Sequence, residues 1–166
     1  MKIRKDYITN SSSSSFILTF STNDDYVEFV EEMDWYDYDE FLTFIKLQLH
    51  RASQEELKKR AKEFLYNVYY AKYEKEVKNN IKNETENLPL IKLFAYLKSK
   101  ECKDLIDDKI KNDNNYIESI NKINNSEKIV FSTILDTNGG LIEWAIRNGF
   151  LKQTCRKYLL IQHDVG

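Results

Sequence analysis

The stretch Ser15-Phe16-Ile17-Leu18-Thr19-Phe20 decides the fold that we predict for this chain. It is a short apolar run, rich in residues that favour β-structure, and it stands at the end of a run of five serines, Ser11–Ser15. An apolar run of this length beside turn-forming residues is typical of a buried strand. We therefore predict a strand over 15–20 around which the other elements are organised.

The residues before this strand carry the most distinctive pattern in the chain. The opening IRKDYITNSSSSSFIL, within Met1–Leu18, resembles a start shared by many small, otherwise divergent proteins of low-GC bacteria and their phages. The resemblance implies a class of source, without an activity or a catalytic residue. By their chemistry, serine hydroxyls favour turns and helix caps. Hydroxyls and backbone N–H groups that cradle a phosphate are the alternative, but no P-loop lysine follows the serines.

Two later segments also have the composition of strands. Ile129–Leu135 is nearly continuous in β-formers, so we expect it to be the central strand, and Tyr158–His163 supplies the last one. With 15–20, strands near 129–136 and 157–163 make a small sheet. Met1–Asn10 is expected to add an edge strand.

Helical spacing dominates between the first two strands. Ser21 or Thr22 is a candidate N-cap, and Tyr26, Phe29, Val30 and Met33 follow at helical intervals. Further helices are predicted over 38–49, from Ser53 to about 80, from Pro89, from Ser99 and after 140 up to Asn148-Gly149. The helix from Ser99 has a possible break at 112–115. The inward residues predicted for the helix from Ser53 are Leu57, Ala61, Phe64, Leu65, Val68 and Ala71. Ile45–His50 also alternates like a strand, and 121–126 is predicted as loop. The fold class is therefore α+β, one domain over 1–166 with a helical lobe at approximately 21–123.

Composition narrows the class of protein. The 166 residues are 42% hydrophobic and 31% charged, which suits one globular domain with a real core. A net charge of −2 argues against direct nucleic-acid binding. The start lacks the apolar stretch of a signal peptide, and no apolar run approaches the roughly 20 residues that a membrane helix needs. We expect a cytoplasmic protein with no membrane contact.

Residue types that carry chemistry are scattered. Cys102, Cys155, His50 and His163 are isolated from one another, so no metal or cofactor is expected. The turn Asp136–Gly140 between a strand and a helix is the best small-ligand candidate, because glycines allow close approach and a helix start attracts anions. A tight turn capped by Thr137 or Asn138 explains the same residues. The residues of this possible ligand site are Asp136, Asn138, Gly139, Gly140 and His163.

A nucleophile is the other chemistry to weigh. His163 could act as a base toward Ser132 or Cys155. Its neighbour Asp164 should point to the opposite face of the strand, where it cannot orient the imidazole. A half-buried strand cysteine is the ordinary interpretation of Cys155.

The segment from Asp24 to Glu40 differs from the rest of the chain in its charge. Between Asp24 and Glu40 there are nine acidic residues and not one Lys or Arg, with aromatic residues among them. Aromatic rings supply buried area at interfaces, and carboxylates select a basic partner. A solvated helix face with its aromatics in the core is the alternative. The predicted partner-binding residues are Asp24, Asp25, Glu28, Glu31, Glu32, Asp34, Trp35, Tyr36, Asp37, Tyr38, Asp39 and Glu40.

Two hypotheses of function follow. The first is a non-enzymatic module that docks a basic surface of another protein through the acidic, aromatic segment. Together with the phage-like opening, this suggests a mobile-element inhibitor of a host nucleic-acid-binding defence complex, acting as a nucleic-acid mimic. The second is a small enzyme or phosphate-binding domain that uses the Asp136–Gly140 turn and His163.

Overall fold

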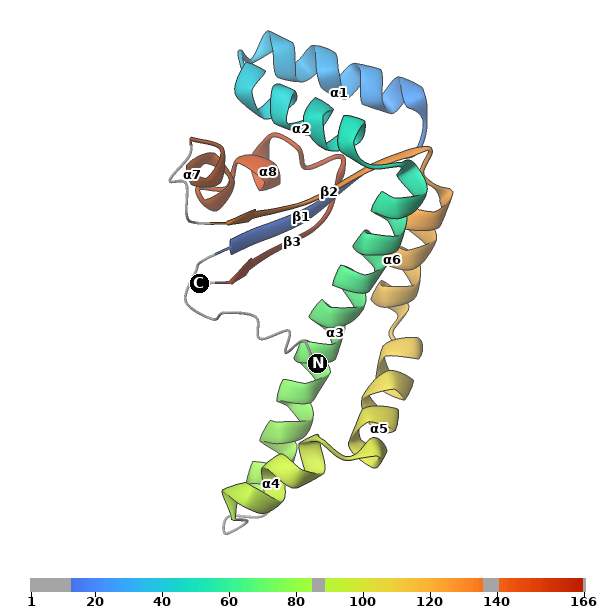
Figure 1. Ribbon diagram of the computed structural model, residues 1–166, viewed down its shortest axis with the longest axis vertical. Coiled ribbons are helices and arrows are strands. Elements are labelled where there is room, and N and C mark those ends of the chain that lie inside the picture. Colours follow the sequence, from blue (N-terminus) through green and yellow to red (C-terminus); the bar gives the residue numbers. More distant parts are fainter. Residues whose placement is uncertain (1–12, 85–88, 136–140, 166) are drawn as a thin grey trace, which may run out of the picture. The chain divides into compact units, whose positions relative to one another are not determined.

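The computed structural model describes residues 13–84, 89–135 and 141–165 (Figure 1). The helices and strands follow in this order: β1 (Ser13–Phe20), α1 (Asn23–Trp35), α2 (Asp39–Arg51), α3 (Gln54–Glu84), α4 (Leu90–Leu97), α5 (Lys100–Lys111), α6 (Asn114–Asn125), β2 (Lys128–Leu135), α7 (Leu141–Arg147), α8 (Phe150–Gln153) and β3 (Leu159–Val165). The predicted α+β class is confirmed, with a helical insertion between the first and second strands.

The three strands form one antiparallel sheet in the order β2-β1-β3. Phe16 lies opposite Ser132 on β2 and opposite Gln162 on β3. The strand over 15–20 is therefore the central one, and the expectation that 129–135 would be central is wrong. A continuous apolar run indicates that both faces of a strand are buried. A strand at the edge of a sheet can meet this condition too, so the run does not show that the strand is central.

The serines at the start of β1 belong to the strand. The Ser14 hydroxyl donates to Asp164 Oδ1 on β3 at 2.6 Å, and the Ser15 hydroxyl shares a hydrogen bond with Thr133 Oγ1 on β2 at 2.9 Å. Both serines are buried, so these bonds satisfy hydroxyls that water cannot reach. Ser13–Ser15 thus pair across the sheet instead of forming a turn. Ser11, Ser12 and the edge strand expected within Met1–Asn10 lie outside the described residues.

Helices α1, α2, α7 and α8 pack on one face of this sheet (Figure 1). Phe16, Leu18 and Phe20 alternate toward that face, where their side chains are fully buried. The rings of Phe29 and Tyr158 lie 5.1 and 5.0 Å from the ring of Phe20. This aromatic core fixes α1 and α2 on the sheet.

The first helix begins and ends with defined hydrogen bonds. Thr22, one of the two predicted N-cap candidates, makes a reciprocal capping box with Asp25. At the other end, the backbone N–H of Tyr38 donates to Met33 O at 3.0 Å and that of Asp37 donates to Asp34 O at 3.1 Å. Asp37 has a φ of 59°, so this is a Schellman ending with an aspartate in the left-handed position. The sharp turn brings the chain directly into α2.

Several element boundaries differ from prediction. The stretch 45–50 is helical, which confirms the helix over its strand-like alternation. The predicted loop 121–126 is wrong, because α6 continues to Asn125. A second short helix, α8, follows Gly149, whose φ of 90° suits glycine. The helix propensity of the residues does not by itself set these boundaries, because the burial of Ile123 and Phe150 stabilises helix beyond the predicted ends.

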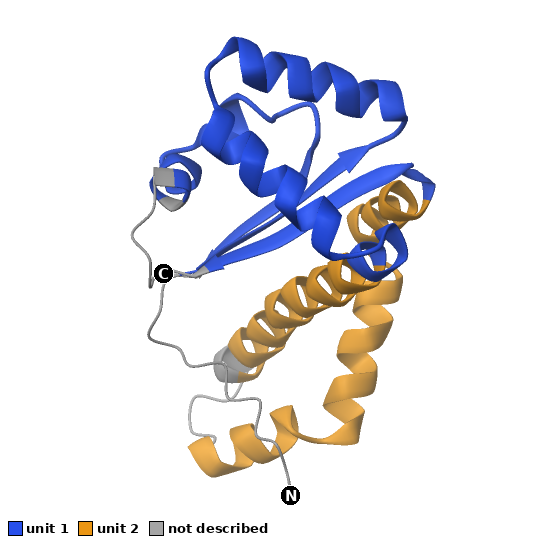
Figure 2. Ribbon diagram, turned by 45° about the horizontal axis from the view of Figure 1, so that its top comes forward, with its two compact units in different colours: residues 1–58, 125–166 blue, residues 59–124 orange. Residues whose placement is uncertain are grey.

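The chain divides into two compact units, shown in Figure 2. Unit 1 comprises residues 1–58 and 125–166 and contains the sheet; unit 2 comprises 59–124. The first two helices of the predicted lobe at 21–123 therefore belong with the sheet. The assignment of the whole chain to a single domain stays a prediction.

Unit 2 is built around tyrosines. Val77 on α3 and Cys102, Ile106 and Ile110 on α5 form its buried cluster, and partly buried rings pack against it. These rings are Tyr66, Tyr69, Tyr70, Tyr73, Tyr96 and Tyr116. The predicted stripe of α3 is correct at its start and wrong at Ala71, which is exposed. On either side of Ala71, tyrosines of α3 line the cluster beside Val77, and their hydroxyls can reach its edge.

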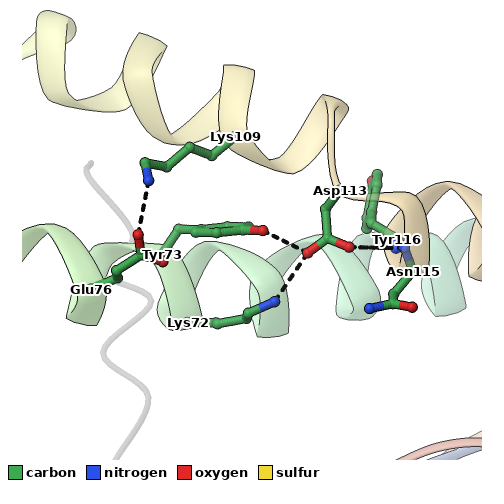
Figure 3. A network of polar contacts seen from close by, with 7 residues as sticks. All are labelled: Lys72, Tyr73, Glu76, Lys109, Asp113, Asn115 and Tyr116. Carbon is green, nitrogen blue, oxygen red and sulfur yellow. Dashed lines mark hydrogen bonds and ion pairs between the residues drawn. The ribbon is translucent and has the colours of Figure 1, made fainter.

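Asp113 links three helices of unit 2 (Figure 3). One carboxylate oxygen accepts from Tyr73 Oη at 2.6 Å and from Lys72 Nζ at 3.0 Å, both on α3. The other accepts from the backbone N–H groups of Asn115 and Tyr116, which caps the start of α6. The hydrogen bonds from Tyr73 and Lys72 lower the pKa of Asp113 to about 2.

Candidate functional site

The acidic segment 24–40 covers α1, the Schellman turn and the first residues of α2. Because Phe29 and Met33 face the core, the intervening carboxylates lie on the outer side of α1. Glu32 and Asp25 are half-buried, and the other seven acidic residues are exposed. The segment predicted for partner binding therefore exposes most of its carboxylates, and we call these residues the acidic surface of unit 1.

Some of these carboxylates have a structural role. Asp25 belongs to the capping box of α1. Glu28 accepts from Lys157 Nζ at 2.7 Å, an exposed ion pair. Asp39 and Glu40 lie in the first turn of α2, where the positive end of the helix dipole favours acids. A role in the stability of the fold is therefore sufficient to explain these carboxylates, and no partner protein is needed to explain them.

Glu31 and Asp34 have no such role. They lie in the second half of α1, near the negative end of the helix dipole, and the last turn of this helix contains no basic residue. Within the described part of the chain, neither carboxylate has an ion-pair or hydrogen-bond partner. Asp34 lies in the last turn, where an acid lowers helix stability, and Glu31 stands one residue before that turn. Glu31 and Asp34 are thus two exposed acids of the segment that the fold does not explain.

The three predicted aromatic residues separate into two groups. Trp35 and Tyr36 are 84% and 54% exposed, at the end of α1. Tyr38 is half-buried and packs edge-on against Phe150, with ring centroids 4.6 Å apart. The alternative interpretation, in which the aromatic residues of the segment belong to the core, therefore holds among these three for Tyr38 alone.

Sequence reasoning missed a groove beside this surface. It has a volume of about 460 Å³ and lies between the start of α2 and helices α7 and α8 of the same unit. We call it the α2–α7 groove. Its lining residues are Asp37, Tyr38, Asp39, Glu40, Phe41, Ile142, Trp144, Ala145 and Phe150. Trp144 was not singled out, because one aromatic in a short amphipathic helix carries no signal in the sequence.

The alternative ligand site is only partly described. Asp136, Asn138, Gly139 and Gly140 lie outside the described residues. His163 lies opposite Ser15 in the sheet register, whereas the Asp164 carboxylate accepts from Ser14 on the other face. This divergence confirms the alternation expected for His163 and Asp164. Ser132 lies opposite Phe16, on the face away from His163, so the two are not brought together.

Cys155 does not have the properties of a nucleophile. Its side chain is fully buried, and this burial, with a smaller effect of Glu32, raises the pKa of the thiol to about 12. Burial also raises the pKa of Cys102 in unit 2. A reactive cysteine needs a lowered pKa and access to solvent.

We therefore expect native Cys155 to resist alkylation. At about pH 8 the thiolate would be roughly one part in 10,000 of the thiol population, and the side chain is inaccessible. Mass spectrometry after treatment with iodoacetamide should show slow labelling of the folded chain and rapid labelling in concentrated guanidinium chloride. Fast labelling of Cys155 in the folded protein would contradict the buried position.

The described residues show neither a metal centre nor a membrane-spanning helix. They contain no group of three or more His, Cys, Asp or Glu side chains placed to hold a metal ion. None of the helices described is both long and apolar enough to cross a membrane.

No protein-family model, curated protein or solved structure matches the chain. The acidic surface and the α2–α7 groove are therefore the features on which a function can be argued.

Proposed function

We propose that this protein is a non-enzymatic binding module that docks a basic surface of another protein through segment 24–40. The observation that carries the proposal is the exposed position of Glu31 and Asp34, with Asp34 at the unfavourable end of α1, beside exposed Trp35 and Tyr36. The Asp34 carboxylate works against helix stability, and the aromatics leave apolar area in water. A basic partner would compensate both.

The physics of interfaces gives the two kinds of residue separate roles. Carboxylates without an internal partner create a negative potential that speeds encounter with a positive surface. At physiological salt this potential decays over a screening distance of about 8 Å. Trp is enriched among the residues that dominate interface affinity, because its ring buries a large area. Association should therefore depend on salt through the acids, while dissociation should depend on the aromatic residues.

The class of partner that we propose is a nucleic-acid-binding protein. Carboxylates repeated along the outer side of α1 offer negative charges to Lys and Arg side chains that otherwise contact phosphates. The opening residues suggest that the context is a mobile element that inhibits a host defence complex. This finer assignment rests on charge and on the resemblance of the opening.

Neutralising the two unexplained acids separates function from stability. The double variant Glu31→Gln/Asp34→Asn is expected to unfold at the same or a higher denaturant concentration. The free energy of unfolding should rise by up to about 0.3–1 kcal/mol, mainly from Asp34, because its unfavourable interaction with the helix dipole is removed. The same variant should capture less of the partner from a cell extract. Urea titration and quantitative mass spectrometry of the captured proteins measure the two effects.

A matched control changes equal charge elsewhere. Asp104→Asn/Glu118→Gln removes two exposed acids of unit 2 and should leave capture unchanged. A protein lost by the first variant and kept by the second would then be purified, and its association rate measured at low and high salt. If both variants retain the same proteins with the same affinity, the acidic segment is only solvated surface and the proposal is wrong.

A further inference from the structure

The α2–α7 groove has an apolar, firmly packed floor. Phe41 and Phe150 are buried, and their rings meet edge-on with centroids 5.0 Å apart. Tyr38 packs edge-on against the same Phe150 ring. Interlocked rings of this kind do not collapse into a neighbouring space. The groove is therefore a preformed hollow.

One wall of the groove is a large side chain in water. Trp144 on α7 is 66% exposed and lines the groove, together with Ile142 and Ala145. Exposed aromatics beside an apolar hollow mark binding sites more often than isolated surface residues do. Trp35 is more exposed still, but it does not line the groove.

The opposite rim of the groove carries acidic side chains. Asp37, Asp39 and Glu40 line the groove and are exposed, and none of the described residues that line it is Lys, Arg or His. An apolar hollow with a negative rim is complementary to an apolar side chain that has positive neighbours. The volume of about 460 Å³ lies near the lower end of ligand-site sizes, about 300–1,000 Å³, so it admits one or two side chains and not a folded element.

From these observations we infer that the α2–α7 groove receives a bulky apolar side chain of the partner, flanked by Lys or Arg residues that contact the acidic rim. The inference rests on the proposed function and specifies its anchor. A standard interface buries about 800 Å² on each partner, far more than the groove offers. The groove therefore supplies the central anchor and the acidic surface of α1 supplies the surround.

Short peptides test this directly. The probes are Lys-Lys-Leu-Lys-Lys, the same peptide with Ala at the centre, and Glu-Glu-Leu-Glu-Glu. Because the chain has two tryptophans, a nitrogen-labelled sample gives one indole N–H signal in the groove and one outside it. The Trp35→Phe and Trp144→Phe variants assign the two signals.

The expected result is specific to one tryptophan and one peptide. Lys-Lys-Leu-Lys-Lys should shift the Trp144 signal and leave the Trp35 signal in place. It should bind about tenfold more tightly than the Ala peptide, since a leucine side chain then leaves water. The acidic peptide should not shift either signal.

Variants of the groove should reproduce this difference. Trp144→Ala is expected to weaken binding of the Leu peptide about tenfold, and Trp35→Ala to leave it unchanged. The triple variant Asp37→Asn/Asp39→Asn/Glu40→Gln should weaken both basic peptides and reduce their dependence on salt. Asn at position 37 keeps a residue that tolerates the left-handed conformation, so the turn is preserved.

Two outcomes would overturn the inference. Equal, salt-dependent binding of the Leu and Ala peptides with an unmoved Trp144 signal would show a charged surface without an anchor site, and the proposed function would stand. If no peptide shifts the Trp144 signal at millimolar concentration, the groove is not a site for such a side chain. The capture experiment with Glu31→Gln/Asp34→Asn then judges the proposed function separately.

Discussion

Replacing Phe20 by alanine is expected to lower the free energy of unfolding of unit 1 by about 3–5 kcal/mol. Phe20 is fully buried on the central strand, and its ring lies 5.3, 5.1 and 5.0 Å from the rings of Tyr26, Phe29 and Tyr158. Removing the ring loses the transfer energy of the apolar atoms and leaves a cavity that close-packed neighbours cannot fill. A loss of this size is a large part of the whole stability of a domain.

Urea denaturation followed by circular dichroism measures the effect. Phe20→Leu keeps most of the volume and should cost less than about 1.5 kcal/mol, so a graded series remains if the alanine variant does not fold. Phe94→Ala makes the same change at a half-exposed ring on α4 and should alter stability by no more than about 0.5 kcal/mol. Equal losses at Phe20 and Phe94 would contradict the position of Phe20 in the core.

The second large effect is an acid dependence at Asp113. Its pKa is about 2 in the folded chain against an ordinary value of 3.8. A lowered pKa stabilises the fold at pH values above the ordinary one, and this stabilisation is lost as the pH falls from there toward about 2. The shift corresponds to roughly 2 kcal/mol, and the side chain is only 7% exposed.

Asp113→Asn should therefore be less stable than the natural chain by roughly 2 kcal/mol near neutral pH, and the difference should shrink toward zero at about pH 2. Asparagine still accepts hydrogen bonds from the α6 backbone, so this variant isolates the charge. Asp113→Ala also removes the cap and should lose about 1 kcal/mol more. A difference between Asp113→Asn and the natural chain that does not change with pH would contradict the charged contacts with Tyr73 and Lys72.

The two units provide a check on these predictions. Phe20 lies in unit 1 and Asp113 in unit 2. Residues with no shared partner have additive effects on stability. The double variant Phe20→Leu/Asp113→Asn should thus lose the sum of the single losses if the chain unfolds in one transition. Two separate transitions would show that the units unfold independently and that the single-domain prediction fails.

The sequence by itself determined the features that depend on near neighbours. Thr22 and Asp25 stand three residues apart, and this spacing is sufficient for the capping box that the structure contains. Phe29 and Met33 recur at helical intervals and are buried, and the apolar run at 15–20 is a strand. The α+β class follows from such local patterns, because periodicity reports the element and its inner face.

Only the tertiary structure decided what depends on distant residues. Strand order places 15–20 between two strands that are far away in sequence, and no local pattern encodes that choice. Tyrosines form the inner side of unit 2 because Asp107 and Asp113 on other elements accept hydrogen bonds from Tyr66 and Tyr73. The inward stripe predicted for α3 contained no tyrosine, so the prediction missed this cluster.

The candidate site shows the same division. The acidic, aromatic segment is contiguous in sequence, so its charge could be recognised directly. The α2–α7 groove joins residues near 40 to residues near 145, which meet only after α2, α7 and α8 pack on one face of the sheet. Packing also half-buried Tyr38 and left Trp35 and Trp144 in water, because a side chain is buried or exposed according to the elements that surround it.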